Sequence, residues 1–594
     1  MWISKTLVGC LLAVVCSHVL AGEEKPWTEI RSPHFRLITN GGTSEGKDVL
    51  SNLEVMRAVF ETRFPRFRLD SPASLTVLAA KDEATAKLLL PQVWAHPGHK
   101  PGGIYVHGWE REYALVRLDV MGRDPETFQS IYYEYAQSLL HINFHWLPPW
   151  LDVGLAEFYG HTLFSDEKMY IGAPINTGIA GFLAATKPIP LPEFLSSQWS
   201  FSDEKKRELS YMQAWALIHF LCFGPGMERG QRLTRFIDEL QQGVEQKKAF
   251  IETIGGLDDV QRQYQNYVEG LPDRVWTFPM PAQVKGKDFT TRRMTLAETD
   301  AELAAWFIHF HLWDKVRAYA ETAVKSDPKL SLAQEDMGFL DFNQGRDQQA
   351  ADEFFRAYQL DDKNYRALFV STMSREEDSQ IKSERLNKVI ELDPDFAPAY
   401  VELAKVSVAQ GNLDAALVKS RRAVELEPFR AGYRIFTGRI LLRMNRATEA
   451  AEEAAYVIQR WSGPDRDEAF ELWDDIPAGQ RPAGPPVAEA SIEGVSARGT
   501  VEGVTCNGSD FTITLDVSGK PKLFKARGFP VGFSDTLWVG EDHFSPCFHV
   551  VGLRAMLRFR PAKDSAYTGD LMYVGFRDDL PLAPKSENTQ AATH

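Results

Sequence analysis

The pattern of apolar and polar positions changes character several times along this chain. Between about 27 and 120, short apolar runs typical of strands alternate with helical patterns; the strand-like runs are 35–38, 75–78 and 114–118, and the helical ones 48–64 and 82–91. From Asp124 to about 270 the pattern is mainly helical, and Pro148-Pro149 interrupts it once. This order predicts an α+β unit followed by a helical subdomain, together occupying residues 27–285.

Residues 296–460 carry an internal repeat. Small residues recur at equivalent places in successive units: Gly338, Ala404 and Gly438, then Ala350, Ala416 and Ala450. The units end at Pro328, Asp362, Pro394 and Pro428, which are 34, 32 and 34 residues apart. Small residues are required where two helices cross closely, so a period of about 34 residues predicts stacked helix pairs. This segment resembles the tetratricopeptide repeat, and the resemblance implies an α-solenoid of four to five units.

The end of the chain reads as β structure behind a linker. A Pro/Gly-rich stretch at 476–489 predicts a flexible connection. Beyond it, 490–578 contains short alternating runs that predict a small β-barrel-like module, with strands expected at 512–517, 548–551, 555–560 and 571–576. The polar tail, 579–594, is expected to be disordered.

The first residues have the pattern of an export signal. Lys5 precedes a mostly apolar run from Leu7 to Leu20, and small residues stand before the expected cleavage point after Ala21. We therefore expect residues 1–21 to be removed and the mature chain to be periplasmic or extracellular. The alternatives are a buried N-terminal helix or lipid attachment at Cys10.

Composition and charge narrow the class of protein. At 594 residues the chain is long enough for three to five domains. It has 66 basic and 81 acidic residues and a net charge of −15, which argues against nucleic-acid binding. No stretch after residue 25 reaches about 20 apolar residues, so no transmembrane span is expected in the mature chain.

The cysteines point to one disulfide. Three cysteines follow the expected signal, and Cys506 and Cys547 lie in the same small β module, where they could pair in an oxidising compartment. Cys222 stands between Leu221 and Phe223, an apolar setting that predicts a buried thiol.

Two segments resemble the active-site helices of a known enzyme family. The segment 131–140 reads IYYEYAQSLL, and 146–159 reads WLPPWLDVGLAEFY. In outline they resemble the gluzincin, or peptidase MA-like, metallopeptidases, in which an H-E-x-x-H helix and a downstream Glu bind zinc. The resemblance covers about 30–280 and implies a zincin-like α+β domain, here fused to tetratricopeptide repeats.

The zinc ligands of that family are replaced in this chain. The resemblance places Tyr133 and Gln137 at the two His positions and Val153 at the Glu position, so the motif reads Tyr133-Glu134-Tyr135-Ala136-Gln137. Glu134 alone retains its position, that of the general base. Zinc needs several deprotonated N, S or O donors, and these three replacements remove the family's set. We therefore expect no cofactor, and the sequence assigns no catalytic residue.

Other residues could rebuild a metal site. His141 and His145 follow Gln137 at intervals of four residues, a spacing suited to shared ligation on a helix, and Glu157 and His161 come later. The other readings are that Tyr133 fills the vacated cavity or that the cleft is a metal-independent ligand pocket.

These observations predict an exported pseudopeptidase-type binding or scaffolding protein. Its tetratricopeptide groove would hold a protein or peptide partner, and the cleft could hold an extended segment. The alternative is an active metallohydrolase or peptidase that uses Glu134 with a non-standard or rebuilt zinc site. A third reading makes the solenoid primary, as an envelope assembly factor.

Overall fold

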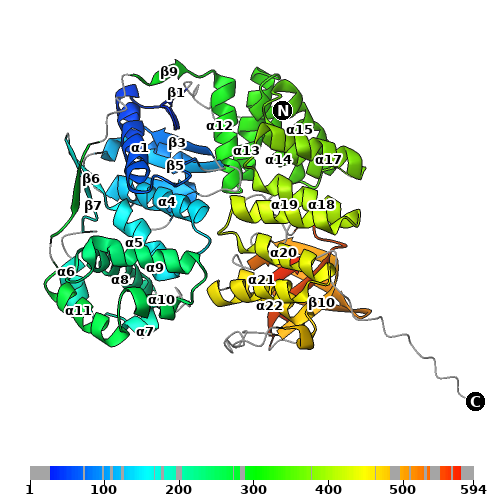
Figure 1. Ribbon diagram of the computed structural model, residues 1–594. Coiled ribbons are helices and arrows are strands. Elements are labelled where there is room, and N and C mark those ends of the chain that lie inside the picture. The colour runs from blue at the N-terminus through cyan, green and yellow to red at the C-terminus, as the bar shows by residue number, and fades with distance from the viewer. Residues whose placement is uncertain are drawn as a thin grey trace, which may run out of the picture.

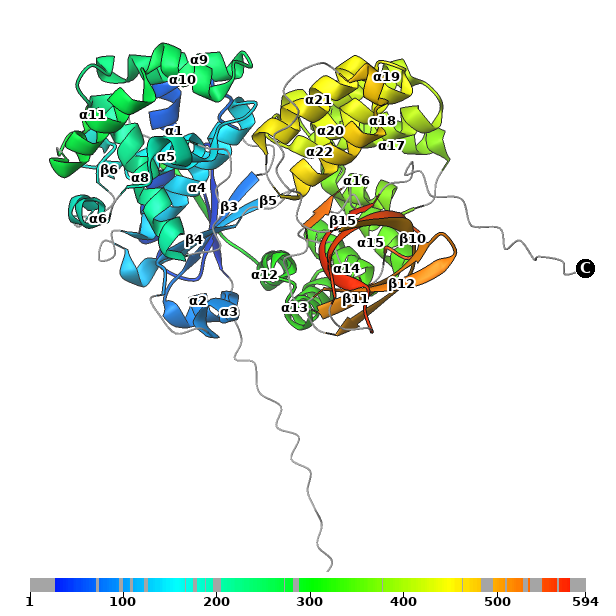
Figure 2. The same cartoon turned by 90° about the horizontal axis from the view of Figure 1, so that it is seen from below.

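The computed structural model contains three parts: an α+β domain, an array of helix pairs and a β-barrel. The residues it describes are 27–70, 74–95, 100–106, 111–121, 126–165, 167–174, 179–186, 188–195, 204–271, 273–280, 288–375, 378–461, 463–481, 495–507, 510–526, 532–534, 547, 549–562 and 566–576. The expected signal at 1–21, most of the linker and the tail at 579–594 lie outside them. Figures 1 and 2 show the α+β domain beside the array and the barrel.

A six-stranded mixed sheet organises the α+β domain. Its order is β4-β5-β3-β2-β1-β9, in which β2, β3 and β5 are parallel and β4, β1 and β9 antiparallel to their neighbours. The strands are β1 (Thr28–Arg31), β2 (Arg36–Thr39), β3 (Ser74–Ala80), β4 (Gly103–Val106), β5 (Arg111–Arg117) and β9 (Thr290–Arg293). The edge strand β9 lies beyond residue 285, so the sheet extends past the limit expected from the sequence.

Both faces of the central strands of this sheet are buried. Val77 and Ala79 of β3 pack in one apolar core with α1 (Thr43–Arg63) and α4 (Glu126–Asn143). Leu78 and Ala80, which point the other way, pack in a second core with α12 (Leu296–His309), the first helix of the array. Successive strand residues face opposite sides, and a sheet covered on both sides needs continuous apolar runs, as β3 and β5 have. Figure 1 shows α12 beside this sheet.

The rest of the α+β domain is mainly helical. The prediction of helices from 124 to 270 with a break at Pro148-Pro149 is confirmed, because α4 ends at Asn143 and α5 begins at Pro149. The other helices are α2 (Glu83–Leu89), α3 (Pro91–Ala95), α5 (Pro149–Gly160), α6 (Ile179–Ala185), α7 (Leu191–Phe194), α8 (Glu204–Phe223), α9 (Gln231–Gln241), α10 (Gln246–Thr253) and α11 (Leu257–Glu269). A small sheet of order β6-β7-β8 joins Leu163–Phe164, Lys168–Ile171 and Trp276–Pro279.

The predicted helix pairs of the array are confirmed, and the array runs past residue 460. It comprises α12, α13 (Trp313–Ser326), α14 (Ser331–Phe342), α15 (Asp347–Leu360), α16 (Tyr365–Met373), α17 (Ser379–Leu392), α18 (Ala397–Ala409), α19 (Leu413–Leu426), α20 (Ala431–Arg443), α21 (Ala447–Arg460) and α22 (Pro464–Asp475). The recurrent alanines Ala350, Ala416 and Ala450 are fully buried. At Gly338 a Cβ would lie 2.5 Å from the Phe354 ring, so α14 and α15 meet closely there.

The C-terminal part is a closed five-stranded barrel, visible end-on in Figure 2. Its strands are β10 (Val495–Asn507), β11 (Asp510–Val517), β12 (Lys520–Ala526), β14 (Arg554–Pro561) and β15 (Gly569–Phe576), and a short strand, β13 (Gly532–Ser534), flanks β15. Parallel pairing of β12 with β15 closes the circle. The expectation of a strand at 548–551 is wrong for its described residues, since 549–551 form a bend and turn before β14. Gly552 follows with a φ of 89°, a left-handed conformation that glycine adopts without strain and that favours a turn.

A disulfide and an array contact fix this barrel. Cys506 at the end of β10 is bonded to Cys547, with their Cα atoms 6.0 Å apart. His549 stacks on Phe342 of α14 at a ring-centroid distance of 3.9 Å. Arg558 of β14 also lies 3.6 Å from Asp467 of α22. The barrel is therefore packed against the array.

Candidate functional site

Helices α4 and α5, which carry the metallopeptidase-like segments, cross at close range because glycines stand at the contacts. A Cβ at Gly160 would lie 3.0 Å from the backbone of Tyr133. At Gly154 a Cβ would lie 2.8 Å from the carbonyl oxygen of Ala214, on α8. The three helices therefore hold their polar side chains within reach of one another.

Gln137, His141 and Asp152 form a hydrogen-bonded cluster between these helices. The Gln137 amide donates to Asp152 Oδ2 at 2.9 Å. His141 Nε2 lies 3.0 Å from Asp152 Oδ1. Asp152 is only 8% exposed, so its carboxylate depends on these two partners in place of water. The structure thus brings Gln137 and His141, two candidate site residues from the sequence, into contact with Asp152. The family pattern does not place a ligand at Asp152.

The other family positions also differ from a zinc site. Val153 is buried and offers no donor atom. Burial raises the pKa of the Tyr133 hydroxyl well above its usual range, and Tyr211 and Asp152 add to the effect. The phenol therefore keeps its proton at neutral pH, and it is the acceptor of a 3.4 Å hydrogen bond from Gln137.

A buried carboxylate lies beside Glu134. Burial, and then the charge of Glu134, raises the pKa of Glu157 to about 8. His161 Nδ1 lies 3.3 Å from Glu157 Oε2 and 2.7 Å from the Glu157 carbonyl oxygen. Burial lowers the pKa of His161. A protonated carboxyl and a neutral imidazole are therefore the favoured pair near neutral pH.

The structure separates His145 from the expected ligand face. Helix α4 ends at Asn143, so His145 is not one turn above His141 on the same helix. Its backbone N–H donates to Gln241 Oε1 at 2.8 Å. Within the described ranges no group of three His, Cys, Asp or Glu side chains is arranged to hold a metal ion.

The array covers one end of this cluster. The Phe429 ring, in the turn before α20, stacks on His141 at 3.9 Å and an interplanar angle of 12°. Nearby, Trp146 Nε1 donates to the carbonyl oxygen of Arg460 at 2.9 Å. Arg68 donates in the same way to Leu426. No local pattern around 141 or 429 pairs these residues, so sequence reasoning did not find the contact.

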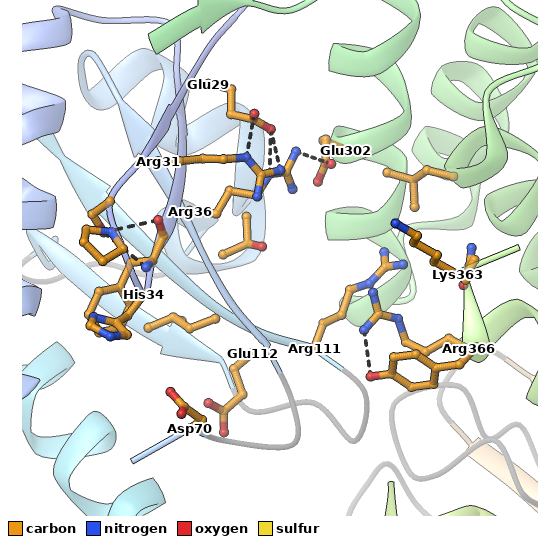
Figure 3. Close-up of a pocket in the computed structure, with 18 of the residues that line it drawn as sticks. Glu29, Arg31, His34, Arg36, Asp70, Arg111, Glu112, Glu302, Lys363 and Arg366 are labelled. Carbon is orange, nitrogen blue, oxygen red and sulfur yellow. Dashed lines mark hydrogen bonds and ion pairs between the residues drawn. The ribbon is translucent and has the colours of Figure 1, made fainter. Parts of the chain in front are cut away.

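A second candidate region is a pocket of about 750 Å³ between the α+β domain and the array (Figure 3). Its lining from the domain includes His34, Arg36, Arg111 and Glu112, and its lining from the array includes Glu302, Glu335, Lys363 and Arg366. Nothing in the sequence connects these residues, because they come from distant segments with ordinary charged patterns.

Glu29 is the centre of an ion-pair network at the rim of this pocket. Its carboxylate lies 2.8 Å from Arg31 and Arg36 and 3.0 Å from Arg292. Burial alone would raise the pKa of Glu29, but the hydrogen bonds from these arginines outweigh it and lower the pKa to about 2. Arg36 also pairs with Glu302 of α12 at 2.6 Å. The network thereby joins β1, β2 and β9 to the array.

No described helix is both long and apolar enough to cross a membrane.

Comparison with known proteins gives matches among solved structures, and those named below cover about a third of this chain. No family model matches the chain, and no curated protein matches it. Among solved structures, MamA is 16% identical, covering 31% of this chain and 98% of its own, with a TM-score of 0.24. Pseudomonas aeruginosa PilF is 14% identical over 30% of this chain and 90% of its own, with a TM-score of 0.27. YrrB, a tetratricopeptide-repeat protein, is 17% identical over 30% of this chain and 87% of its own, with a TM-score of 0.24.

Proposed function

We propose that this chain is an exported binding or scaffolding protein whose metallopeptidase-like domain no longer uses zinc. The observation that carries the proposal is the cluster at Asp152, whose two carboxylate oxygens are engaged by Gln137 and His141. An amide that donates to the carboxylate stabilises its charge without a metal.

The residue types at the family's ligand positions do not fit zinc. Zinc binds deprotonated N, S or O donors. Tyr133 retains its proton, Gln137 offers a neutral amide, and Val153 offers no donor. The role of Glu134 as general base depends on a zinc-bound water, so it lapses with the ligands.

The proposed partner is a protein or peptide bound by the array. The stacked helix pairs of the array agree with the resemblance of its sequence to tetratricopeptide repeats. Stacked helix pairs present extended concave surfaces that such partners use. Part of the array contacts the α+β domain of the same chain, because Trp306 of α12 donates to the carbonyl oxygen of Leu89 at 2.9 Å. Export, expected from residues 1–21, remains part of the proposal.

Metal analysis tests the proposal directly. Protein purified from cells without added metal should contain well under one zinc per chain by mass spectrometry. Soaking in zinc and desalting should leave this value unchanged. A value near one zinc per chain would overturn the proposal.

The second candidate is a hydrolase that uses Glu134, and one observation favours it. Glu157, whose pKa is raised to about 8, lies close enough to Glu134 for their charges to interact. Two carboxyl groups with separated pKa values are a recurrent arrangement for acid–base chemistry. Cleavage of an unstructured protein substrate by the wild type, lost in Glu134→Ala, would establish this function. The proposed binding function predicts no cleavage by either protein.

A further inference from the structure

The pocket between the α+β domain and the array contains two kinds of cation. Most of its arginines are neutralised by a carboxylate across the pocket or beside it. Arg36 lies 2.6 Å from Glu302, Arg111 lies 2.8 Å from Glu335, and Arg57 lies 2.9 Å from Asp70. These pairs hold the walls together and leave little positive charge for a ligand.

Lys363 and Arg366 differ from the other cations. They stand at the turn into α16 and in its first turn, and among the described residues neither has a carboxylate within ion-pair distance. Arg366 donates to the Tyr365 hydroxyl at 3.3 Å, and its Nε is buried without a hydrogen-bond partner. A guanidinium without a carboxylate partner is open to an anionic ligand, which charge-assisted hydrogen bonds would hold.

Lys363 and Arg366 lie together on one side of the pocket (Figure 3). Arg111 lies beside them in the same view, but Glu335 already neutralises its charge. Two like charges repel when brought together, so the side with Lys363 and Arg366 stabilises an anion. A guanidinium and an ammonium together suit a carboxylate, which accepts hydrogen bonds at both oxygens.

Another part of the pocket carries negative charge. Glu112 is buried, and it accepts hydrogen bonds from the hydroxyls of Tyr105 at 2.6 Å and Ser138 at 3.0 Å. Glu112 lies away from Lys363 in Figure 3. Its carboxyl group disfavours a multiply charged anion and favours a ligand with donor groups at its other end.

We propose that this pocket binds a short peptide, with the peptide's terminal carboxylate at Lys363 and Arg366. The volume of about 750 Å³ lies in the range of pockets that enclose small ligands. Leu330, Leu332 and Leu139 also line it and offer apolar contact to side chains. The inference rests on the proposed binding function and assigns it a ligand class and a site.

Binding of defined peptide pools to the full mature chain tests this assignment. One pool of random pentapeptides carries a free C-terminal carboxylate, and a matched pool carries a C-terminal amide. Equilibrium dialysis with mass spectrometry measures the retention of each. We expect the free-acid pool to be retained about tenfold more, the ratio that one charge-assisted hydrogen bond gives.

Two variants locate the site. Lys363→Ala and Arg366→Gln should each lower retention of the free-acid pool about fivefold to tenfold, because each removes a charge facing the carboxylate. Lys325→Ala is the matched control, since Lys325 is an exposed lysine of α13 outside the pocket, and it should leave retention unchanged. Lys363 is also exposed, so its replacement does not endanger folding.

Three results would overturn the assignment: equal retention of the acid and amide pools, retention unaffected by both variants, or displacement by inorganic phosphate but not by acetate. Metal analysis separates this failure from that of the proposed function. If the chain contains no zinc and retains the acid and amide pools equally, only the pocket assignment is refuted. A zinc-containing chain refutes the proposed function, and the peptide measurement still reports on the pocket.

Discussion

Glu157 shows how burial of a single side chain can make stability depend on pH. Its folded-state pKa is about 8 against an ordinary value of 4.5, so between these pH values the folded state binds a proton that the unfolded state has lost. Its contribution to stability is therefore fully present below about pH 4.5 and is lost as pH rises toward 8.

Glu157→Gln should remove this dependence, because the amide does not titrate. The stability of the wild type relative to the variant should fall by about 1.4 kcal/mol for each pH unit across this window. Urea unfolding at pH 5, 6, 7 and 8 measures the difference. Glu252→Gln, at an exposed position, is the control and should parallel the wild type. If the unfolding free energies of Glu157→Gln and the wild type change with pH in parallel, Glu157 is ionised in the folded protein.

Three substitutions test whether α4 and α5 retain the geometry of a zinc site. Tyr133 and Gln137 are one turn apart on α4, and the Gln137 amide already reaches α5 at 2.9 Å. The triple variant Tyr133→His, Gln137→His and Val153→Glu should therefore bind about one zinc per chain. The double variant without Val153→Glu lacks the third ligand and should bind zinc more weakly. A folded triple variant that takes up no zinc would refute the metallopeptidase-like alignment.

At the scale of elements, the close approach of paired helices depends on the smallest residues. Gly338→Ala places a Cβ 2.5 Å from the Phe354 ring, so α14 and α15 must move apart. We expect the free energy of unfolding to fall by about 1–3 kcal/mol. Gly432→Ala, on α20, meets open space and should be neutral or raise stability by up to about 1 kcal/mol. Thermal unfolding of both variants measures the contrast, and equal effects would contradict the packing argument.

Elements with a strong local period could be predicted, and those defined by distant partners could not. The strands near 75–78 and 114–118 and the helix pairs of the array follow from apolar spacing and small residues alone. Strand β9 has four exposed residues, and only its pairing with β1, more than 250 residues earlier, makes it a strand. Likewise, nothing near Leu78 indicates that α12 covers its face of the sheet.

The same distinction applies to the candidate sites. The pairing of α4 with α5 could be predicted from the sequence, because both segments lie within 30 residues and resemble a known motif. Asp152 stands beside the expected ligand position Val153, so its sequence neighbourhood pointed to a functional site. The sequence around Phe429 and Lys363 gave no such indication, because their roles arise only where the array meets the domain.

At the scale of the whole molecule, Glu29 holds strands and array together. It is 4% exposed and contacts Arg31, Arg36 and Arg292. Glu29→Ala removes the shared carboxylate, while Arg36 keeps Glu302 and Arg292 keeps Glu298. The variant should therefore lower the free energy of unfolding by about 1–2 kcal/mol at pH 7, less than the loss of a fully buried partner. Urea unfolding measures the loss. Glu61→Ala, at an exposed site on α1, is the control and should cost far less.

The effect of Glu29 has a defined pH range. Its folded pKa of about 2 lies below the ordinary 4.5, so the stabilisation is present above about pH 4.5 and is lost as pH falls toward 2. The difference between wild type and Glu29→Ala should shrink over that interval. A difference that stays constant down to pH 2 would show that the carboxylate charge is not its cause.

The two attachments of the array to the α+β domain have a mechanical consequence. In an open array each helix pair contacts only its neighbours, so small rotations add along its length and its curvature varies. Here Trp306 anchors the first helix at Leu89, and Phe429 and Arg460 are held at His141 and Trp146. With both ends of the span attached to one domain, these contacts restrain the curvature between them before any ligand binds. A ligand that fits this curvature binds without the conformational entropy cost of ordering the array. A ligand that needs a different curvature must first break one of the contacts to the α+β domain.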